Sequence, residues 1–260
     1  MNPKVLILTG VGINSNRELA ETFELAGATA EQVHISVLED TPEKALDYQL
    51  IAFPGGFSYG DHIASGKILG NLLKFKLGDT LKELASRSVP MIGICNGFQI
   101  LVKLGLLPQM GGEVIQEASL IQNNSGQYED RWVNLKVSDE ARAKSPWFKD
   151  LESLRCPVRH GEGKLVLGSK DDLARLQASG QIALRYTKEG EPTDEYPYNP
   201  NGSWDAIAGI TDPSGLIFGL MPHPEVAIHG TQLPDWTRLE QVPTHTDCLK
   251  LFSNIVNYLK

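Results

Sequence analysis

The chain has 260 residues, of which 41% are hydrophobic, and a formal net charge of -8 at pH 7. A chain of this length buries roughly three quarters of the surface that it exposes when unfolded, so disulfide bonds are not needed for folding. The acidic balance argues against nucleic-acid binding, which normally requires a basic face. Without an N-terminal signal pattern or an apolar run of about 20 residues, we expect neither secretion nor a membrane span. Cys95, Cys156 and Cys248 fit neither a disulfide framework nor a zinc site, so we expect a reduced, cytoplasmic protein.

Short apolar runs alternate with helical patterns through the first hundred residues. The runs that we predict to be strands cover residues 4–9, 33–38, 50–53 and 89–94. Helical spacing of apolar residues predicts helices over residues 17–26, 70–86 and 96–104. Strands that alternate with helices predict an α/β fold with a largely parallel, open sheet covered by helices on both faces.

The second half of the chain is less regular. Residues 131–137 are predicted to form a strand, and residues 206–210 and 215–221 a hairpin. Residues 186–204 and 226–246 are predicted to be loops, and residues 249–259 a closing helix. Because no Gly/Ser-rich linker divides the chain, we expect residues 1–260 to form a single domain.

The strongest local signal is the run Gly-Ile-Cys-Asn-Gly around Cys95, between an apolar strand and a helix. It has the Gly-x-nucleophile-x-Gly spacing of a nucleophile elbow, with cysteine in place of serine. Such a turn projects its nucleophile from the carboxyl edge of the sheet, and the N-terminus of the following helix favours a thiolate. A buried cysteine at an ordinary strand–helix joint is the alternative interpretation.

A cysteine nucleophile needs a histidine base, which in turn needs an orienting group. His160 with Glu162, and His223 with Glu225, are His-x-Glu pairs whose side chains would point the same way in an extended segment. Prolines on both sides of His223 disfavour helix and hold that segment extended, so His223 is the favoured base. The glycines around His160 make a simple turn the competing interpretation there. The histidines expected to be structural or exposed are His34, His62, His229 and His245.

Two glycine-containing loops follow predicted strands. Gly55 and Gly56 follow the third strand, where glycines let backbone N–H groups approach a ligand closely. Together with the N–H of Asn96 they could form an oxyanion hole, although a simple turn would also need glycines. Residues 10–15 resemble part of a dinucleotide-binding fingerprint, but Ser15 replaces its third glycine, which argues against that function.

With these residues, the sequence resembles the class I, triad-type glutamine amidotransferases, which have a flavodoxin-like fold. Within them it is similar to the glutaminase subunits of phosphoribosylformylglycinamidine synthase, an enzyme of purine biosynthesis. The resemblance covers most of the chain and rests on PGGFSYGD (54–61), GICNGFQIL (93–101), GLLP (105–108), NNSGQYEDRWVNL (123–135), RHGEGK (159–164), NPNGS (199–203), IAGI (207–210) and MPHPE (221–225).

The resemblance implies a site in which Cys95 is the nucleophile, His223 the general base and acid, and Glu225 its orienting partner. It implies oxyanion donors from Gly55–Gly56 and Asn96, and a contact between Gln99 and the substrate glutamine. It further implies that glutamine is hydrolysed through a thioester, and that ammonia passes to a separate synthetase subunit that uses ATP and Mg²⁺. No cofactor is expected in this chain, and a small accessory subunit is an expected further partner.

Two positions depart from the family pattern, because a cysteine usually stands at Ser15 and another near Asp130. Neither position belongs to the implied triad. The resemblance also predicts a poor glutaminase without its partner. The loops expected to form a polar docking face are residues 54–61, 160–164 and 186–203. A cysteine hydrolase and a non-catalytic regulatory subunit on the same fold are the alternative functions.

Overall fold

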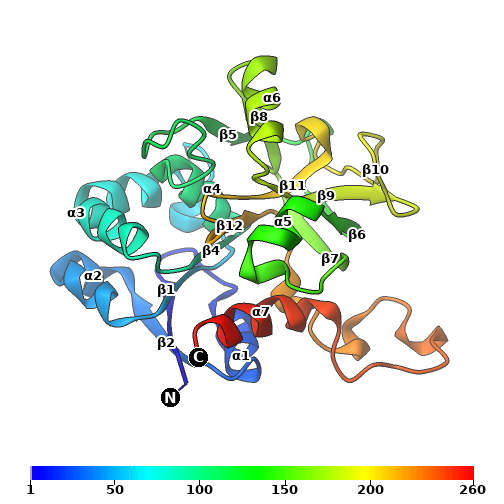
Figure 1. The fold of residues 1–260 in the computed structure, drawn as a ribbon, viewed down its shortest axis with the longest axis horizontal. Coiled ribbons are helices and arrows are strands. Elements are labelled where there is room, and N and C mark those ends of the chain that lie inside the picture. The colour runs from blue at the N-terminus through cyan, green and yellow to red at the C-terminus, as the bar shows by residue number, and fades with distance from the viewer. Residues whose placement is uncertain (1, 62) are drawn as a thin grey trace.

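The computed structural model describes residues 2–61 and 63–260, so the interpretation of His62 lies outside the described residues. An α/β fold is built around one ten-stranded mixed sheet, with the strand order β2-β1-β3-β4-β12-β11-β9-β6-β7 and β10 paired to β9 (Figure 1). Its strands are β1 (Lys4–Thr9), β2 (Thr29–His34), β3 (Leu50–Phe53), β4 (Met91–Ile94), β6 (Glu129–Val137), β7 (Ser153–His160), β9 (Ile182–Lys188), β10 (Glu191–Pro192), β11 (Ile207–Thr211) and β12 (Ile217–Leu220). A separate two-stranded sheet pairs β5 (Ala118–Ile121) with β8 (Lys164–Leu167).

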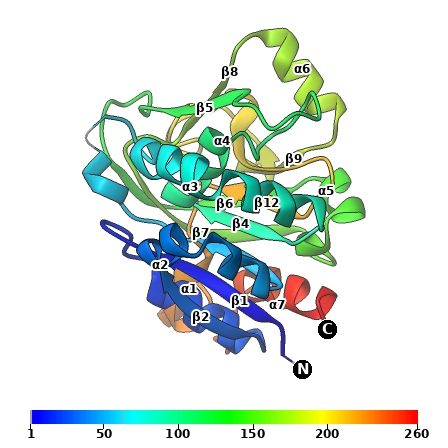
Figure 2. The same cartoon turned by 90° about the vertical axis from the view of Figure 1, so that its left-hand side faces the viewer.

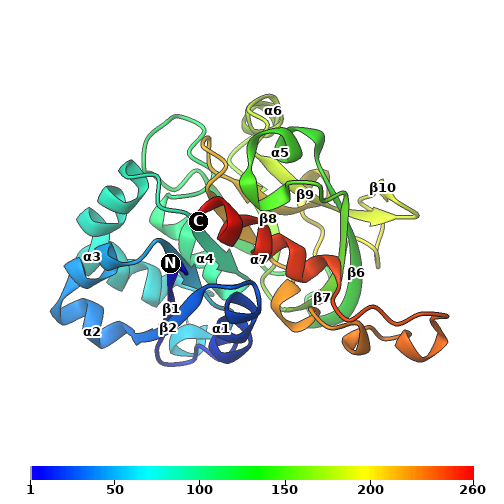
Figure 3. The ribbon, with the colours of Figure 1, turned by 60° about the horizontal axis from the view of Figure 1, so that its bottom comes forward.

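The helices are α1 (Asn16–Leu25), α2 (Ile35–Asp40), α3 (Lys67–Ser86), α4 (Asn96–Leu104), α5 (Asp139–Lys144), α6 (Lys170–Ala178) and α7 (Asp247–Tyr258). α3 packs on α4 (Figure 2), and α4 lies over β3, β4 and β12. α7 runs past α1 (Figure 3), and Phe23 meets Phe252 edge to face with ring centroids 5.2 Å apart.

The sheet has a parallel half and an antiparallel half. β2, β1, β3, β4 and β12 run parallel to one another, whereas β11, β9, β6 and β7 continue the sheet in antiparallel pairs. β3, β4 and β12 are buried along their whole length, as strands covered by helices on both faces should be. The predicted α/β class with its parallel sheet is confirmed, whereas of the antiparallel half the sequence predicted only the strand at β6 and the hairpin of β11 and β12.

Most predicted elements are confirmed. The strands over residues 4–9 and 50–53 and the helix over residues 96–104 have the predicted bounds. α1, α3, α7, β4, β6 and the hairpin of β11 and β12 match with ends shifted by up to three residues. Residues 226–246 contain only 3-10 turns, with one bridge between His229 and His245. β7, β8, α5 and α6 were not predicted.

Two predictions are wrong in part. The strand over residues 33–38 ends at His34, whose side chain caps α2 by accepting a hydrogen bond from the Ser36 N–H at 3.3 Å. Ile35 and Leu38, three residues apart, are buried on one face of that short helix, so tertiary packing overrides the β propensity of the segment. The loop over residues 186–204 begins within β9 and includes β10.

The joint between β4 and α4 is the tightest packing in the parallel half. A Cβ atom on Gly97 would lie 1.9 Å from the carbonyl oxygen of Phe53, the last residue of β3. A Cβ atom on Gly93 would lie 2.5 Å from the Gly97 carbonyl oxygen. Both contacts are with backbone atoms that cannot move aside, so the two glycines of the elbow motif allow α4 to start directly against the sheet.

We therefore expect Gly97→Ala to destabilise the fold by about 3 kcal/mol or more, because the added methyl group overpacks a rigid backbone. Gly78→Ala is the matched control, since a Cβ atom at that helical position would have no neighbour within 4 Å. It should stabilise the protein by about 1 kcal/mol through helix propensity. Urea unfolding of the three proteins measures both changes, and equal stability of Gly97→Ala and wild type would contradict the packing argument.

Candidate active site

Cys95 occupies a strained turn at the carboxyl end of β4. Its φ and ψ are 52° and -105°, a conformation that is unfavourable for a residue with a side chain. The Cys95 N–H donates a hydrogen bond to the Leu220 carbonyl at 2.8 Å, which fixes the turn to β12. The Cys95 sulfur lies 3.6 Å from the Arg159 carbonyl oxygen, and only 6% of the residue is exposed. The predicted elbow is present, with the positive end of α4 beneath the sulfur.

His223 and Glu225 form a buried pair behind the nucleophile. The His223 Nδ1 atom lies 2.6 Å from Glu225 Oε1, although Glu225 stands in a 3-10 turn and not in extended chain. The backbone N–H of His223 donates to the Pro157 carbonyl at 2.8 Å, and the backbone carbonyl of Glu225 accepts from the Thr22 hydroxyl at 3.3 Å. β7 and α1 thus hold the two ends of the pair.

The charges around His223 favour its protonated form. Burial of the imidazole disfavours protonation, but the Glu225 carboxylate and the Cys95 side chain outweigh it and raise the pKa of His223 to about 10. Since Nδ1 faces the carboxylate, Nε2 is the atom left for proton transfer. Within residues 2–61 and 63–260, Nε2 is buried without a hydrogen-bond partner.

The other His-x-Glu pair is not arranged as a relay. The His160 Nδ1 atom lies 3.2 Å from Asn123 Oδ1, whereas a carboxylate oxygen of Glu162 accepts a hydrogen bond from the Ser65 N–H at 3.0 Å. Burial lowers the pKa of His160 to about 3, so its ring is neutral at physiological pH. The structure therefore favours His223 over His160 as the base.

The glycine loop after β3 lies directly against the ring of His223. A Cβ atom on Gly55 would lie 2.7 Å from His223 Cε1, so only glycine lets the loop approach the ring. Gly56 has a φ of 152° and forms an isolated bridge with Ile13, whose hydrogen bonds are donated by Phe57 and Asn14. The bridge leaves the Gly56 N–H out of its hydrogen bonds, as an oxyanion donor requires.

Gly12, in the first loop of the chain, packs against the glycine loop that follows β3. Phe57 N–H donates to the Gly12 carbonyl at 2.7 Å, and a Cβ atom on Gly12 would lie 2.0 Å from the Phe57 carbonyl oxygen. Gly12 therefore serves backbone packing against the glycine loop, and no nucleotide needs to be invoked to explain it.

Asn96 and Gln99, on the first turn of α4, are engaged with protein atoms. The Asn96 N–H has no partner within the helix because it belongs to the first turn. The Asn96 side chain accepts from the Ser58 N–H at 3.2 Å and donates to Gln99 Oε1 at 3.0 Å. Gln99 Nε2 donates to the Glu162 carbonyl at 2.6 Å, so one N–H and one lone pair of the amide remain for a further contact.

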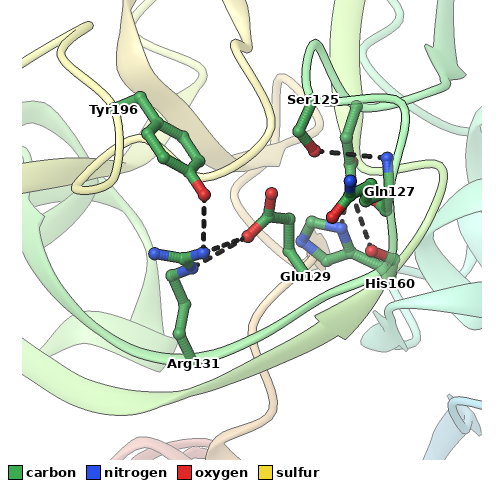
Figure 4. A network of polar contacts seen from close by, with 7 residues as sticks. Ser125, Gln127, Glu129, Arg131, His160 and Tyr196 are labelled. Carbon is green, nitrogen blue, oxygen red and sulfur yellow. Dashed lines mark hydrogen bonds and ion pairs between the residues drawn. The ribbon is translucent and has the colours of Figure 1, made fainter.

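Sequence reasoning missed a polar wall contributed by β6 and the segment before it. Figure 4 shows Glu129 and Arg131 of β6 beside His160, with Tyr196 reaching Arg131 from a distant loop. Asn123 donates to the His160 carbonyl at 2.8 Å and fixes the end of β7 next to the nucleophile. Residues 123–135 include these polar side chains, but their alternation along the chain predicted only a strand.

Known proteins share this architecture and these motifs. The profile of the CobB/CobQ-like glutamine amidotransferase domain matches residues 2–259. The chain is 42% identical over 258 residues to phosphoribosylformylglycinamidine synthase subunit PurQ of Dehalococcoides mccartyi, covering 99% of this chain and 98% of that one. It is 38% identical to the PurQ subunit of Methanococcus maripaludis strain C7, covering 98% and 97% of the two chains.

The chain belongs to the PurQ family of glutamine amidotransferases.

Solved structures agree with the family. A chain from the structure of PurLQS from Thermotoga maritima superposes with a TM-score of 0.74 at 32% identity, covering all of both chains. The glutaminase domain of Trypanosoma brucei CTPS, at 13% identity and a TM-score of 0.53, shares the fold. The PurQ motifs thus cover both the parallel half with the elbow and the antiparallel half that supplies the walls.

The part of the chain that the structure describes contains neither a membrane-spanning helix nor a cluster of metal-binding side chains. No helix in residues 2–61 or 63–260 has the length and apolar character to cross a bilayer. In the same part of the chain, no group of three or more His, Cys, Asp or Glu side chains is placed to hold a metal ion.

Replacing Glu225 tests the charge balance at His223. Because the carboxylate raises the pKa of His223, Glu225→Gln should lower that pKa, and the ring should lose its proton at a lower pH than in wild type. The measurement is an NMR titration of the histidine C2–H signals, assigned with His223→Ala. An unchanged titration of His223 in Glu225→Gln would contradict the proposed pairing.

Proposed function

We propose that this chain is the glutaminase subunit of a phosphoribosylformylglycinamidine synthase, with Cys95, His223 and Glu225 as its catalytic triad. The observation that carries the proposal is a cysteine in an elbow turn beside a buried histidine–carboxylate pair whose Nε2 has no partner among the described residues. The PurQ family supplies the substrate class, which is the side-chain amide of glutamine. A cytoplasmic location is part of the same proposal.

The reaction proceeds in two halves. The Cys95 thiolate attacks the carboxamide carbon of glutamine, and the N–H groups of the Gly55–Gly56 loop and of Asn96 stabilise the oxyanion that forms. His223 gives its proton to the departing nitrogen, so ammonia leaves and a thioester remains. Water then attacks the thioester while His223 takes its proton, and glutamate leaves as the thiolate re-forms. Glu225 holds the ring in the correct tautomer and balances its positive charge.

Other residues in the proposal hold the substrate or the geometry. Gln99 is proposed to contact the bound glutamine through the N–H or the lone pair that its present hydrogen bonds leave free. No cofactor is assigned to this chain. The ATP and Mg²⁺ that the amination step needs are assigned to a separate synthetase subunit, and a small accessory subunit completes the complex, as the name PurLQS suggests for the Thermotoga maritima relative.

Covalent labelling tests the nucleophile. A glutamine analogue with an electrophilic carbon at the amide position should modify Cys95 alone, because only Cys95 combines the elbow with His223. Peptide mass spectrometry locates the label, and His223→Ala should slow labelling strongly. Modification of Cys156 or Cys248 with Cys95 untouched would move the nucleophile. Failure to release ammonia from glutamine would favour a cysteine hydrolase or a regulatory subunit.

The synthetase is proposed to dock over the mouth of the site. Val11, Phe57 and Tyr128 form an exposed apolar rim there: the Val11 carbonyl accepts from the Tyr59 N–H at 3.0 Å, and the rings of Phe57 and Tyr128 are 6.3 Å apart. The rim borders the active site, because Phe57 follows Gly55 and Gly56, and a Cβ atom on Gly55 would lie 2.7 Å from His223 Cε1. Exposed apolar patches mark interaction sites, so we propose a docking face that includes this apolar rim beside the polar loops that the sequence suggested.

A charge on the rim tests docking. Val11, which is 59% exposed, can become aspartate without changing the core, and Val11→Asp should weaken synthetase binding at least about tenfold. Phe75→Asp is the control, because Phe75 on α3 is 87% exposed and lies outside the rim. Binding is measured by surface plasmon resonance, and ammonia release by each chain with and without the synthetase shows whether docking activates the site. Equal binding by both variants would place the interface elsewhere.

A further inference from the structure

Glu162 connects two parts of the active site although it takes no part in the triad. It stands in the turn between β7 and β8, two residues after the end of the strand whose Arg159 carbonyl contacts Cys95. Its carbonyl accepts from Gln99 Nε2 at 2.6 Å, and its carboxylate accepts from the Ser65 N–H at 3.0 Å. One residue therefore bridges the elbow helix and the segment that leads into α3.

The same segment is tied to the glycine loop. Asp61 accepts from the Ser65 hydroxyl at 3.0 Å and from the Gly66 N–H at 3.3 Å, and its other contact is with Asn96 Nδ2 at 3.4 Å. Asn96 in turn accepts from the Ser58 N–H at 3.2 Å. These bonds close a ring, which we call the loop clamp and which consists of Ser58, Asp61, Ser65, Asn96, Gln99 and Glu162.

Residues 59–61 lie in the left-handed region of backbone conformation. Tyr59, Gly60 and Asp61 have φ values of 54°, 72° and 52°, and the left-handed region is unfavourable for the tyrosine and the aspartate. Residues in such conformations persist only when surrounding structure holds them. The loop clamp supplies that restraint at Asp61, while the Tyr59 N–H is held by the Val11 carbonyl at 3.0 Å.

We propose that Glu162 is a positioning residue that holds the oxyanion donors of the glycine loop in register with Cys95, acting through Ser65, Asp61 and Asn96. The inference rests on the proposed glutaminase function. Oxyanion donors are effective only at hydrogen-bond distance from the developing charge, and a misplacement of about 1 Å can cost roughly 100-fold in rate. Glu162 thus acts on the transition state without touching the substrate.

The test compares Glu162→Ala and Glu162→Gln in the complex with the synthetase. Glu162→Ala should lower kcat for glutamine hydrolysis about 100-fold with KM changed little, because the donors are misplaced but the nucleophile remains. Glu162→Gln keeps an oxygen that can accept from Ser65 and should recover most of the rate. Alkylation of Cys95 by iodoacetamide forms no oxyanion, so its rate should stay at the wild-type value in both variants. Glu117→Ala is the matched control, since Glu117 accepts backbone N–H bonds from Met110 and Gly111 in a loop outside the clamp.

Each outcome decides one question. Wild-type hydrolysis rates in Glu162→Ala would overturn the proposal. Parallel loss of hydrolysis and alkylation, with a lower melting temperature than Glu117→Ala, would also overturn it, because Glu162 would then be only structural. Absence of glutamine hydrolysis by the wild-type complex would instead refute the proposed function and would be recognised before any variant is compared.

Discussion

The contact between Gly97 and the end of β3 determines where the nucleophile and the glycine loop can lie. Because a Cβ atom on Gly97 would lie 1.9 Å from the Phe53 carbonyl oxygen, only glycine lets α4 start against the end of β3, and the elbow of Cys95 is fixed relative to that strand. The chain leaves β3 directly into Gly55 and Gly56, so the same contact sets the glycine loop relative to the sulfur. Nucleophile and oxyanion donors therefore share one rigid reference, which electrostatic preorganisation requires.

The antiparallel half of the sheet contributes backbone groups that position Cys95 and His223. β7 offers the Pro157 carbonyl to the His223 N–H and the Arg159 carbonyl to Cys95, so one strand positions both proton-transfer partners. The cost of burying the charges of His223 and Glu225 is offset by their close pairing and by the Cys95 side chain. Loss of either member would leave the charge of the other buried and unpaired. Hydrogen bonds from His223 to β7 and from α1 to Glu225 hold the two residues in place.

The sequence predicted the parts of the site that depend on local chemistry. The elbow, the proline-flanked His223 and the glycines after β3 each have a short-range pattern with a direct physical cause. The strand over residues 33–38 was wrong because burial of Ile35 and Leu38 is decided by distant elements. The contacts of Gly12 and Glu162 were not predicted for the same reason. Their partners, Phe57 and Ser65, are far away in sequence, and no local period encodes such contacts.

The placement of Phe57 links docking to catalysis. Its ring is exposed on the rim, while its N–H is bonded to the Gly12 carbonyl and its neighbour Gly56 carries an oxyanion donor. A partner can activate the site only if it contacts the active and resting conformations differently. A subunit that packs on the Phe57 ring meets this condition, because any shift of the glycine loop moves that ring. The strained residues 59–61 next to it are the part of the loop whose conformation most needs such external contacts.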